Sequence, residues 1–156
     1  MIHALPVAGG ILALAPLPGG SGTYDADLLH LHDWRPALVI SMTTLAEMTA
    51  SGAASLGADL QDRGTRWAHV PVEDYGVPSP EVMDRWEAAA QAALLALQGG
   101  GRVLIHCRGG CGRSGMAALR LMIESGEEAE AALTRLRAVH PCAVETDAQM
   151  AWARRV

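Results

Sequence analysis

The residues best suited to chemistry lie in one glycine-rich loop, His106-Cys107-Arg108-Gly109-Gly110-Cys111-Gly112-Arg113-Ser114. An apolar run at residues 103–105 precedes this loop and predicts a buried strand, and residues 115–123 after it predict a helix. Glycines leave the backbone amides unobstructed, so the amides can turn inward around an anion. The helix N-terminus adds unpaired N–H groups and positive potential. The loop therefore indicates a phosphate-binding cradle with a nucleophile at its base.

Cys107 is the candidate nucleophile of this cradle. The loop amides and the guanidinium of Arg113, which would grip a phosphate dianion, also stabilise the thiolate. A thiolate can attack phosphorus in line and form a thiophosphate intermediate, while Arg113 and the amides hold the equatorial oxygens. We expect the Ser114 hydroxyl to hydrogen-bond the sulfur and ease its departure in the second step. His106 is expected to orient the loop through hydrogen bonds rather than to transfer protons.

A leaving alkoxide or phenolate needs a proton, and Asp74 is the candidate general acid. It follows a predicted strand at residues 66–72, in a loop that Gly76 and Pro78 make stiff but hinged. The same carboxylate would act as a base toward water in the second step. Glu73 is the rival acid, and a purely local alternative is an aspartate that hydrogen-bonds its own backbone.

This pattern resembles the cysteine-dependent protein phosphatases. Cys107, five further residues, then Arg113 and Ser114 resemble their signature, especially that of the dual-specificity group around the cyclin-dependent-kinase-associated phosphatase and its bacterial relatives. Residues 74–78 resemble that group's general-acid loop, and residues 141–149 resemble its segment after the active-site helices. The resemblance spans the chain from about Ala37 onward. It implies a phosphomonoester hydrolase that acts on phosphotyrosine or phosphoserine/threonine in proteins or peptides, without a metal or other cofactor.

The loop itself is expected to contact the substrate, through its amides and arginines, at Arg108, Gly109, Gly110, Cys111, Gly112 and Arg113. Cys111 departs from the family pattern, but it should not impede phosphate binding because amides do that work. Oxidation is expected to link Cys107 to Cys111 or Cys142. Gln149 completes a capping box with Thr146, so it either only caps its helix or also positions water or substrate.

Three other functions use some of the same residues. A rhodanese-like sulfurtransferase also carries a cysteine loop at a strand end but needs no upstream acid, so Asp74 discriminates against it. A thiol-dependent arsenate reductase would pair Cys107 with Cys111 or Cys142, and its turnover would survive Asp74→Asn. In a non-catalytic phosphate-binding module, the nucleophile, arginine, hydroxyl and acid would have no reason to occur together.

The composition limits the number of domains and the possible partners. The chain has 156 residues, half of them apolar, which predicts one domain over residues 1–156 with a real core. Its formal charge of −5 argues against nucleic acid or acidic membranes as partners. Three cysteines do not suggest a disulfide framework, and a thiol enzyme suits a reducing cytoplasm. Cys107 and Cys111 beside His106 lack a second ligand pair, which makes zinc improbable. We interpret the other histidines as structural or surface residues: His30, His32, His69 and His140.

Strand and helix signals alternate along the chain. Residues 4–18 are apolar but interrupted by proline and glycine, with no basic residue before them, which favours a hairpin over a secretion leader. Strands are predicted at residues 37–42, 66–72 and 103–105. Helices are predicted at residues 54–63, 80–98, 115–123 and 146–154. Capping boxes at residues 44–47 and 125–128 predict the starts of two further helices. This alternation predicts an α/β fold, a single domain with a mostly parallel sheet and helices on both faces. Ligands bind at the carboxyl ends of such strands, where Cys107 falls.

Overall fold

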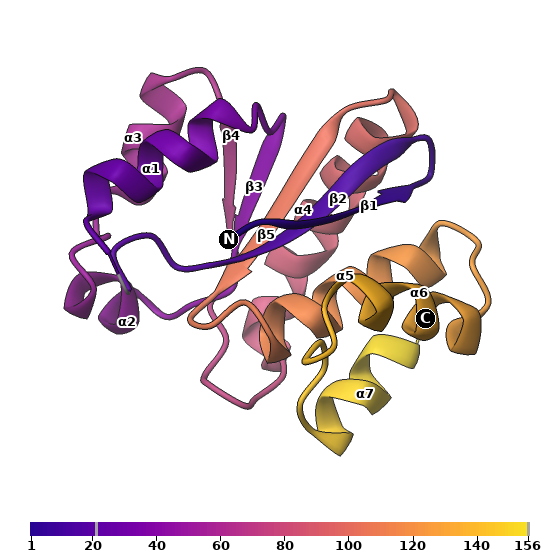
Figure 1. Cartoon of the computed structure of the whole chain (residues 1–156). Coiled ribbons are helices and arrows are strands. Elements are labelled where there is room, and N and C mark those ends of the chain that lie inside the picture. Colours follow the sequence, from indigo (N-terminus) through magenta and orange to yellow (C-terminus); the bar gives the residue numbers. More distant parts are fainter. Residues whose placement is uncertain (21, 156) are drawn as a thin grey trace.

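The computed structural model describes residues 1–20 and 22–155 and has a five-stranded sheet at its centre, in the order β1-β2-β5-β3-β4 (Figure 1). The strands are β1 (His3–Val7), β2 (Gly10–Pro16), β3 (Leu38–Ser41), β4 (Arg66–His69) and β5 (Arg102–Cys107). β1 and β2 are antiparallel, and the other neighbouring strands are parallel. The predicted N-terminal hairpin is confirmed: Ala8 and Gly9 both have positive φ, as its two-residue turn requires.

Helices cover both faces of this sheet, as the alternation of signals predicts (Figure 1). The helices are α1 (Tyr24–Asp33), α2 (Leu45–Ala50), α3 (Leu56–Asp62), α4 (Pro80–Gln98), α5 (Gly112–Glu124), α6 (Ala129–Val139) and α7 (Asp147–Arg154). Buried side chains of α1–α3 pack in one hydrophobic cluster, and those of α4–α7 pack in another. The α/β class with a mostly parallel sheet is therefore confirmed.

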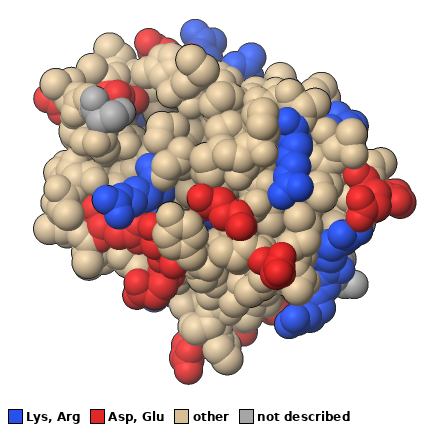
Figure 2. Space-filling model, turned by 60° about the horizontal axis from the view of Figure 1, so that its bottom comes forward, with Lys and Arg blue, Asp and Glu red and all other residues tan. Residues whose placement is uncertain are grey.

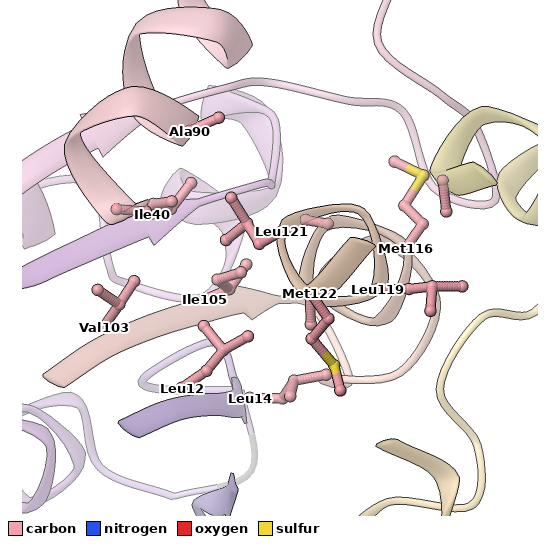
Figure 3. Close-up of a cluster of buried hydrophobic side chains, with 14 of the residues drawn as sticks. Leu12, Leu14, Ile40, Ala90, Val103, Ile105, Met116, Leu119, Leu121 and Met122 are labelled. Atoms are coloured by element: carbon pink, nitrogen blue, oxygen red, sulfur yellow. The ribbon is translucent and has the colours of Figure 1, made fainter. Parts of the chain in front are cut away.

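The central strand β5 contributes side chains to both hydrophobic clusters, because successive side chains of a strand point to opposite faces of the sheet. Val103 and Ile105 join the cluster beneath α4 and α5, whereas Leu104 joins the cluster beneath α1–α3. Figure 3 shows Leu12 and Ile40 of the neighbouring strands with Val103 and Ile105 in the first of these clusters. A strand buried on both faces and paired on both edges fixes the position of the loop that follows it.

Several element boundaries differ from the prediction. β4 ends at His69 rather than at residue 72, and α5 begins at Gly112, three residues earlier than the periodicity indicates. The capping box expected at residues 125–128 is wrong. Ser125 instead ends α5 and donates its hydroxyl to the carbonyl of Met122, and Glu128 caps α6 by accepting from the N–H of Ala131. Gly126 has a φ of +110° and separates the two helices.

The parallel strands β2, β3, β4 and β5 end at the same edge of the sheet. The loops that follow β3, β4 and β5 therefore meet there, although residues 70–101 separate β4 from β5 along the chain. Within the described residues, no helix is long and apolar enough to cross a membrane.

Candidate active site

The glycine-rich loop connects β5 to α5 and carries Cys107 at its start. The Cys107 side chain is buried, and its Sγ lies 3.2 Å from Oγ of Ser114 in the first turn of α5. This is the contact that the sequence predicts for Ser114. Gly110 turns the loop with a φ of +81°, and a Cβ there would lie 2.9 Å from the carbonyl carbon of Ala15. The tight approach to β2 therefore requires glycine at this position.

A hollow of about 270 Å³ opens over this loop. It is lined by Asp74, Tyr75, Cys107, Arg108, Gly109, Cys111, Gly112, Arg113 and Glu145. The structure thus brings the predicted nucleophile, arginine and acid to one site, together with most of the predicted loop contacts. Gly110, Ser114, His106 and Gln149, which were also predicted, are not part of this lining. Glu145 was not predicted, and only its place in the tertiary structure reveals it.

Arg113 is buried and held by a carboxylate that the sequence analysis treated only as part of a capping box. Its Nη1 donates to Oε1 of Glu47 at 2.7 Å and to the carbonyl of Val72 at 2.8 Å, and its Nη2 donates to Oε2 of Glu47 at 2.9 Å. A guanidinium has five N–H donors. Three are used here, so two remain for an incoming ligand. Glu47 and Val72 therefore hold the guanidinium of Arg113 in place through Nη1 and Nη2.

The Arg113–Glu47 pair is electrostatically tight. Hydrogen bonds from Arg113, with further ones from Thr44, lower the pKa of Glu47 to about 2 despite the opposing effect of burial. Burial alone would lower the pKa of Arg113, but Glu47 and the neighbouring negative groups raise it above its ordinary value. Glu47 also accepts from the backbone N–H of Thr44, so the predicted capping box of α2 is present. One carboxylate thus caps a helix and fixes Arg113.

Asp74 lies in the acid loop (residues 73–78) after β4, and its Oδ1 is 3.4 Å from Nη2 of Arg113. The side chain is exposed, and it also accepts a hydrogen bond from the N–H of Tyr75 at 3.0 Å. Asp74 therefore makes the local backbone hydrogen bond that was its alternative role, and it also lines the hollow. Glu73 is exposed and does not line the hollow. The geometry favours Asp74 over its rival.

His106 lies fully buried behind the loop in a chain of hydrogen bonds. Nε1 of Trp67 donates to Oγ of Ser41 at 2.8 Å, and the Ser41 hydroxyl lies 2.5 Å from Nε2 of His106. This order of donors fits a neutral ring that carries its proton on Nδ1, which faces the carbonyl of Cys107 at 3.4 Å. Burial lowers the pKa of His106 to about 4. The ring is therefore neutral at physiological pH, and its role in orienting the loop stays a prediction.

Gln149 does more than cap α7. Its Oε1 accepts from the backbone N–H groups of Glu145 and Thr146, and its Nε2 donates to the carbonyl of Gly76 at 3.2 Å. The capping box with Thr146 is present as predicted. The Gln149 amide therefore joins the α6–α7 connection to the acid loop, a contact that capping alone would not require.

The cysteines are paired differently from the expectation. Cys111 and Cys142 form a disulfide with a Cα–Cα distance of 5.3 Å, and Cys107 is a free, buried thiol. The expected links from Cys107 to Cys111 or Cys142 are thus absent from the structure, and the expectation of no structural disulfide is wrong. The reason is tertiary: α6 returns the chain so that Cys142, 31 residues later, lies beside Cys111.

Charges of both signs are mixed over the face at the bottom of the view in Figure 1. Figure 2 brings this bottom forward and shows acidic and basic side chains interspersed. Around the hollow itself, Arg108 and Arg113 are accompanied by Asp74 and Glu145. This mixture differs from the continuous basic surface that binds nucleic acids.

Fold and site together define a phosphatase of the cysteine-dependent α/β type. The family model described as "Swiss Army Knife protein, DSP-PTPase phosphatase domain" matches residues 24–156, and the chain belongs to this family. It is therefore a phosphatase domain of the dual-specificity and tyrosine phosphatase class, a hydrolase, as the loop predicts. No curated protein matches the chain at the sequence level.

Solved structures agree with this class. A kinase-associated phosphatase whose catalytic-site cysteine is replaced by serine superposes with a TM-score of 0.86 at 22% identity, over 99% of this chain and 92% of that one. Tk-PTP in its active form gives a TM-score of 0.77 at 26% identity, over 99% and 98% of the two chains. PTPMT1 in complex with PI(5)P gives 0.75 at 17% identity, over 97% and 92%.

Proposed function

We propose that this chain hydrolyses phosphomonoesters of proteins or peptides through a cysteinyl-phosphate intermediate. Cys107 is the nucleophile, Arg113 and the loop amides bind the phosphate, and Asp74 is the general acid. The observation that carries the proposal is that Asp74, from the acid loop after β4, borders the same hollow as Cys107 and Arg113 of the glycine-rich loop. Membership of a phosphatase family supports this function over a sulfurtransferase or an arsenate reductase.

In the first step, the Cys107 thiolate attacks phosphorus and a P–S bond forms as the P–O bond to the leaving group breaks. The two unused donors of Arg113 and the loop amides hold the equatorial oxygens, where negative charge accumulates. Asp74 transfers its proton to the leaving oxygen. Its place in the lining of the hollow and the 3.4 Å distance between its Oδ1 and Nη2 of Arg113 support this role.

In the second step, the Asp74 carboxylate takes a proton from water, and the water oxygen attacks phosphorus. The P–S bond breaks and inorganic phosphate leaves. The Ser114 hydroxyl, 3.2 Å from Sγ, donates a hydrogen bond to the departing thiolate. Because Ser114 lies on the first turn of α5, the helix N-terminus and this hydroxyl stabilise the same negative charge.

The rim of the hollow favours a phosphoprotein with either type of phosphorylated side chain. The rim carries the exposed side chains of Tyr75 and of the cationic Arg108, and Asp74 and Glu145 also line the hollow. A polyanionic ligand would meet these two carboxylates, whereas a single phosphoryl group can reach the loop between them. We therefore propose phosphotyrosine and phosphoserine/threonine peptides as the substrate class.

The first test replaces the nucleophile. Cys107→Ser should abolish hydrolysis of an aryl phosphate because the alcohol is a far weaker nucleophile than a thiolate, while tungstate binding measured by calorimetry should persist. Rapid acid quench of the wild type during turnover should show a protein mass increased by one phosphoryl group, and the variant should not. Turnover that survives in the serine variant would refute the covalent mechanism.

The second test separates the two acidic residues of the acid loop. Asp74→Asn should lower kcat by about 10²–10⁴-fold, with a larger loss for alkyl phosphates than for aryl phosphates, which need less protonation. Glu73→Gln is the matched control because Glu73 neighbours Asp74 but lies outside the hollow. Its kcat should stay near that of the wild type. Equal losses in both variants, or a loss in Glu73→Gln alone, would move the general acid away from Asp74.

A further inference from the structure

A second group of reactive side chains joins the glycine-rich loop to the end of α6, and one member, Cys111, also lines the hollow. Cys111 comes from the loop, His140 ends α6, and Cys142 follows two residues later. Sγ of Cys111 is 3.8 Å from Nε2 of His140, and Sγ of Cys142 is 3.2 Å from the same nitrogen. All three candidate ligand atoms lie within 4.8 Å of one another. Two sulfurs and an imidazole nitrogen are donors that Zn²⁺ prefers.

We propose that Cys111, His140 and Cys142 form a zinc-binding site when the two cysteines are reduced. The sequence pattern alone suggests zinc ligands only in Cys107 and Cys111 beside His106, without a second ligand pair. The tertiary structure instead supplies Cys142 and His140 as the partners of Cys111. Neither Cys107 nor Arg113 belongs to this site, so it stands or falls independently of the phosphatase mechanism proposed above.

The spacing of the three side chains fits the metal. Tetrahedral zinc with Zn–S of about 2.3 Å and Zn–N of about 2.0–2.1 Å separates sulfur from nitrogen by about 3.5 Å and two sulfurs by about 3.8 Å. The observed sulfur-to-nitrogen distances, 3.2 and 3.8 Å, lie on either side of that value. Only the two sulfurs, which are bonded to each other in the structure, must move apart. Side-chain rotation about Cβ supplies that movement.

The disulfide and the zinc complex are two states of the same cysteines. A dithiol reductant transfers two electrons and two protons, the S–S bond breaks, and the reductant itself becomes a disulfide. Zn²⁺ then binds both sulfurs as thiolates and displaces their two protons to solvent. Cys142 is exposed and Cys111 is half-buried, so reductant and metal can reach the pair. Water can complete the fourth position.

His140 couples this site to the phosphate-binding loop. Its ring is mostly buried and stacks on His3 with centroids 3.9 Å apart, which fixes its plane. In the disulfide form, Nε2 of His140 donates to the carbonyl of Gly110 at 2.7 Å. Nε2 can bind a metal only through a free lone pair. The proton on Nε2 must therefore move to Nδ1, and the hydrogen bond from Nε2 to the carbonyl of Gly110 must break. Zinc binding therefore removes one anchor of the loop, and we expect it to lower phosphatase activity.

Cobalt provides the direct test because thiolate-bound Co²⁺ gives a charge-transfer absorption that other ligands do not. The protein should carry Cys107→Ser, so that the catalytic thiol cannot contribute. It is reduced, desalted without oxygen and titrated with Co²⁺, and Zn²⁺ is then added. We expect one equivalent of thiolate-bound cobalt that zinc displaces stoichiometrically. The same protein in its disulfide form should show no such absorption.

Ligand variants in that background identify the site. Cys142→Ala should weaken metal binding by more than about 100-fold, since even residues behind metal ligands change affinity by about 10–100-fold. His140→Ala should do the same, and Cys111→Ala provides a second sulfur variant if either is poorly folded by circular dichroism. His30→Ala removes an exposed histidine on α1 and should leave the titration unchanged. The absence of thiolate-bound cobalt in the reduced protein, or its persistence in Cys142→Ala, would overturn the proposal.

Discussion

At the scale of single residues, the ion pair between Arg113 and Glu47 decides how the phosphate-binding arginine is presented. Arg113 is 2% exposed, and Glu47 contacts it with both carboxylate oxygens. A buried guanidinium without a partner is costly, and a bidentate carboxylate also fixes its plane. Glu47 therefore acts through Arg113 and is a positioning residue. A capping box was the only sequence signal for Glu47, because the approach of α2 to α5 is not visible locally.

Replacing that carboxylate tests its positioning role. Glu47→Gln keeps the size of the side chain but leaves Arg113 with one neutral acceptor, so we expect kcat/KM to fall by about 10²-fold, the cost typical of a misplaced group. Tungstate affinity should fall as well, which a purely structural role would not require. Glu87→Gln on the exposed face of α4 is the control. Unchanged tungstate affinity in a folded Glu47→Gln protein would contradict the role.

At the scale of elements, the glycine-rich loop depends on a close approach to β2. Gly110 combines a φ of +81° with contacts to the backbone of Ala15 and Pro16, whereas a Cβ at Gly109 would meet open space. The two adjacent glycines thus have different reasons to be glycine. Gly110 is required by its positive φ and by its close approach to the backbone of β2, whereas the position of Gly109 has room for a side chain.

This difference can be measured as stability. Gly110→Ala should lower the free energy of unfolding by about 1–3 kcal/mol, because it places a side chain in a left-handed conformation and against backbone atoms. Gly109→Ala should change it by less than about 0.5 kcal/mol, as at other open surface positions. Urea denaturation of both variants provides the comparison. Equal effects at the two positions would show that the loop does not pack against β2 as described.

At the scale of the whole molecule, stability should depend on pH through two groups that the fold keeps in their less protonated forms. Burial lowers the pKa of His106 from 6.5 to about 4, and Arg113 lowers that of Glu47 from 4.5 to about 2. In each window the unfolded chain binds more protons than the folded one. The folded state therefore loses stability as the pH falls from about 6.5 to 4 because of His106, and from about 4.5 to 2 because of Glu47.

Unfolding measured against pH checks this expectation. The slope from one such group approaches about 1.4 kcal/mol per pH unit inside its window. His106→Asn should flatten the curve between about pH 4 and 6.5, and Glu47→Gln should flatten it only below about pH 4.5. Chemical denaturation at a series of pH values distinguishes the two. A curve that keeps its slope in His106→Asn would show that this imidazole does not carry the dependence.

Features that depend on neighbours in the chain could be predicted without the structure. Glycine spacing around Cys107, the alternation of strand and helix signals, and the acidic loop after β4 were enough to predict the α/β fold and the candidate site. Capping boxes at Thr44 and Thr146 are equally local and are present. The box predicted at Ser125 failed because Gly126 turns the chain there and Glu128 offers a competing cap.

Contacts between segments far apart in the chain could not be predicted in this way. The pairing of Arg113 with Glu47, the contact of Gln149 with Gly76 and the disulfide between Cys111 and Cys142 all join distant segments. Sequence spacing carries no information on these distances, because each depends on how the helices pack on the sheet. The parallel strands end at one edge, α6 and α7 pack against α5, and Glu47 of α2 reaches Arg113 there, so the tertiary structure selects which side chains meet.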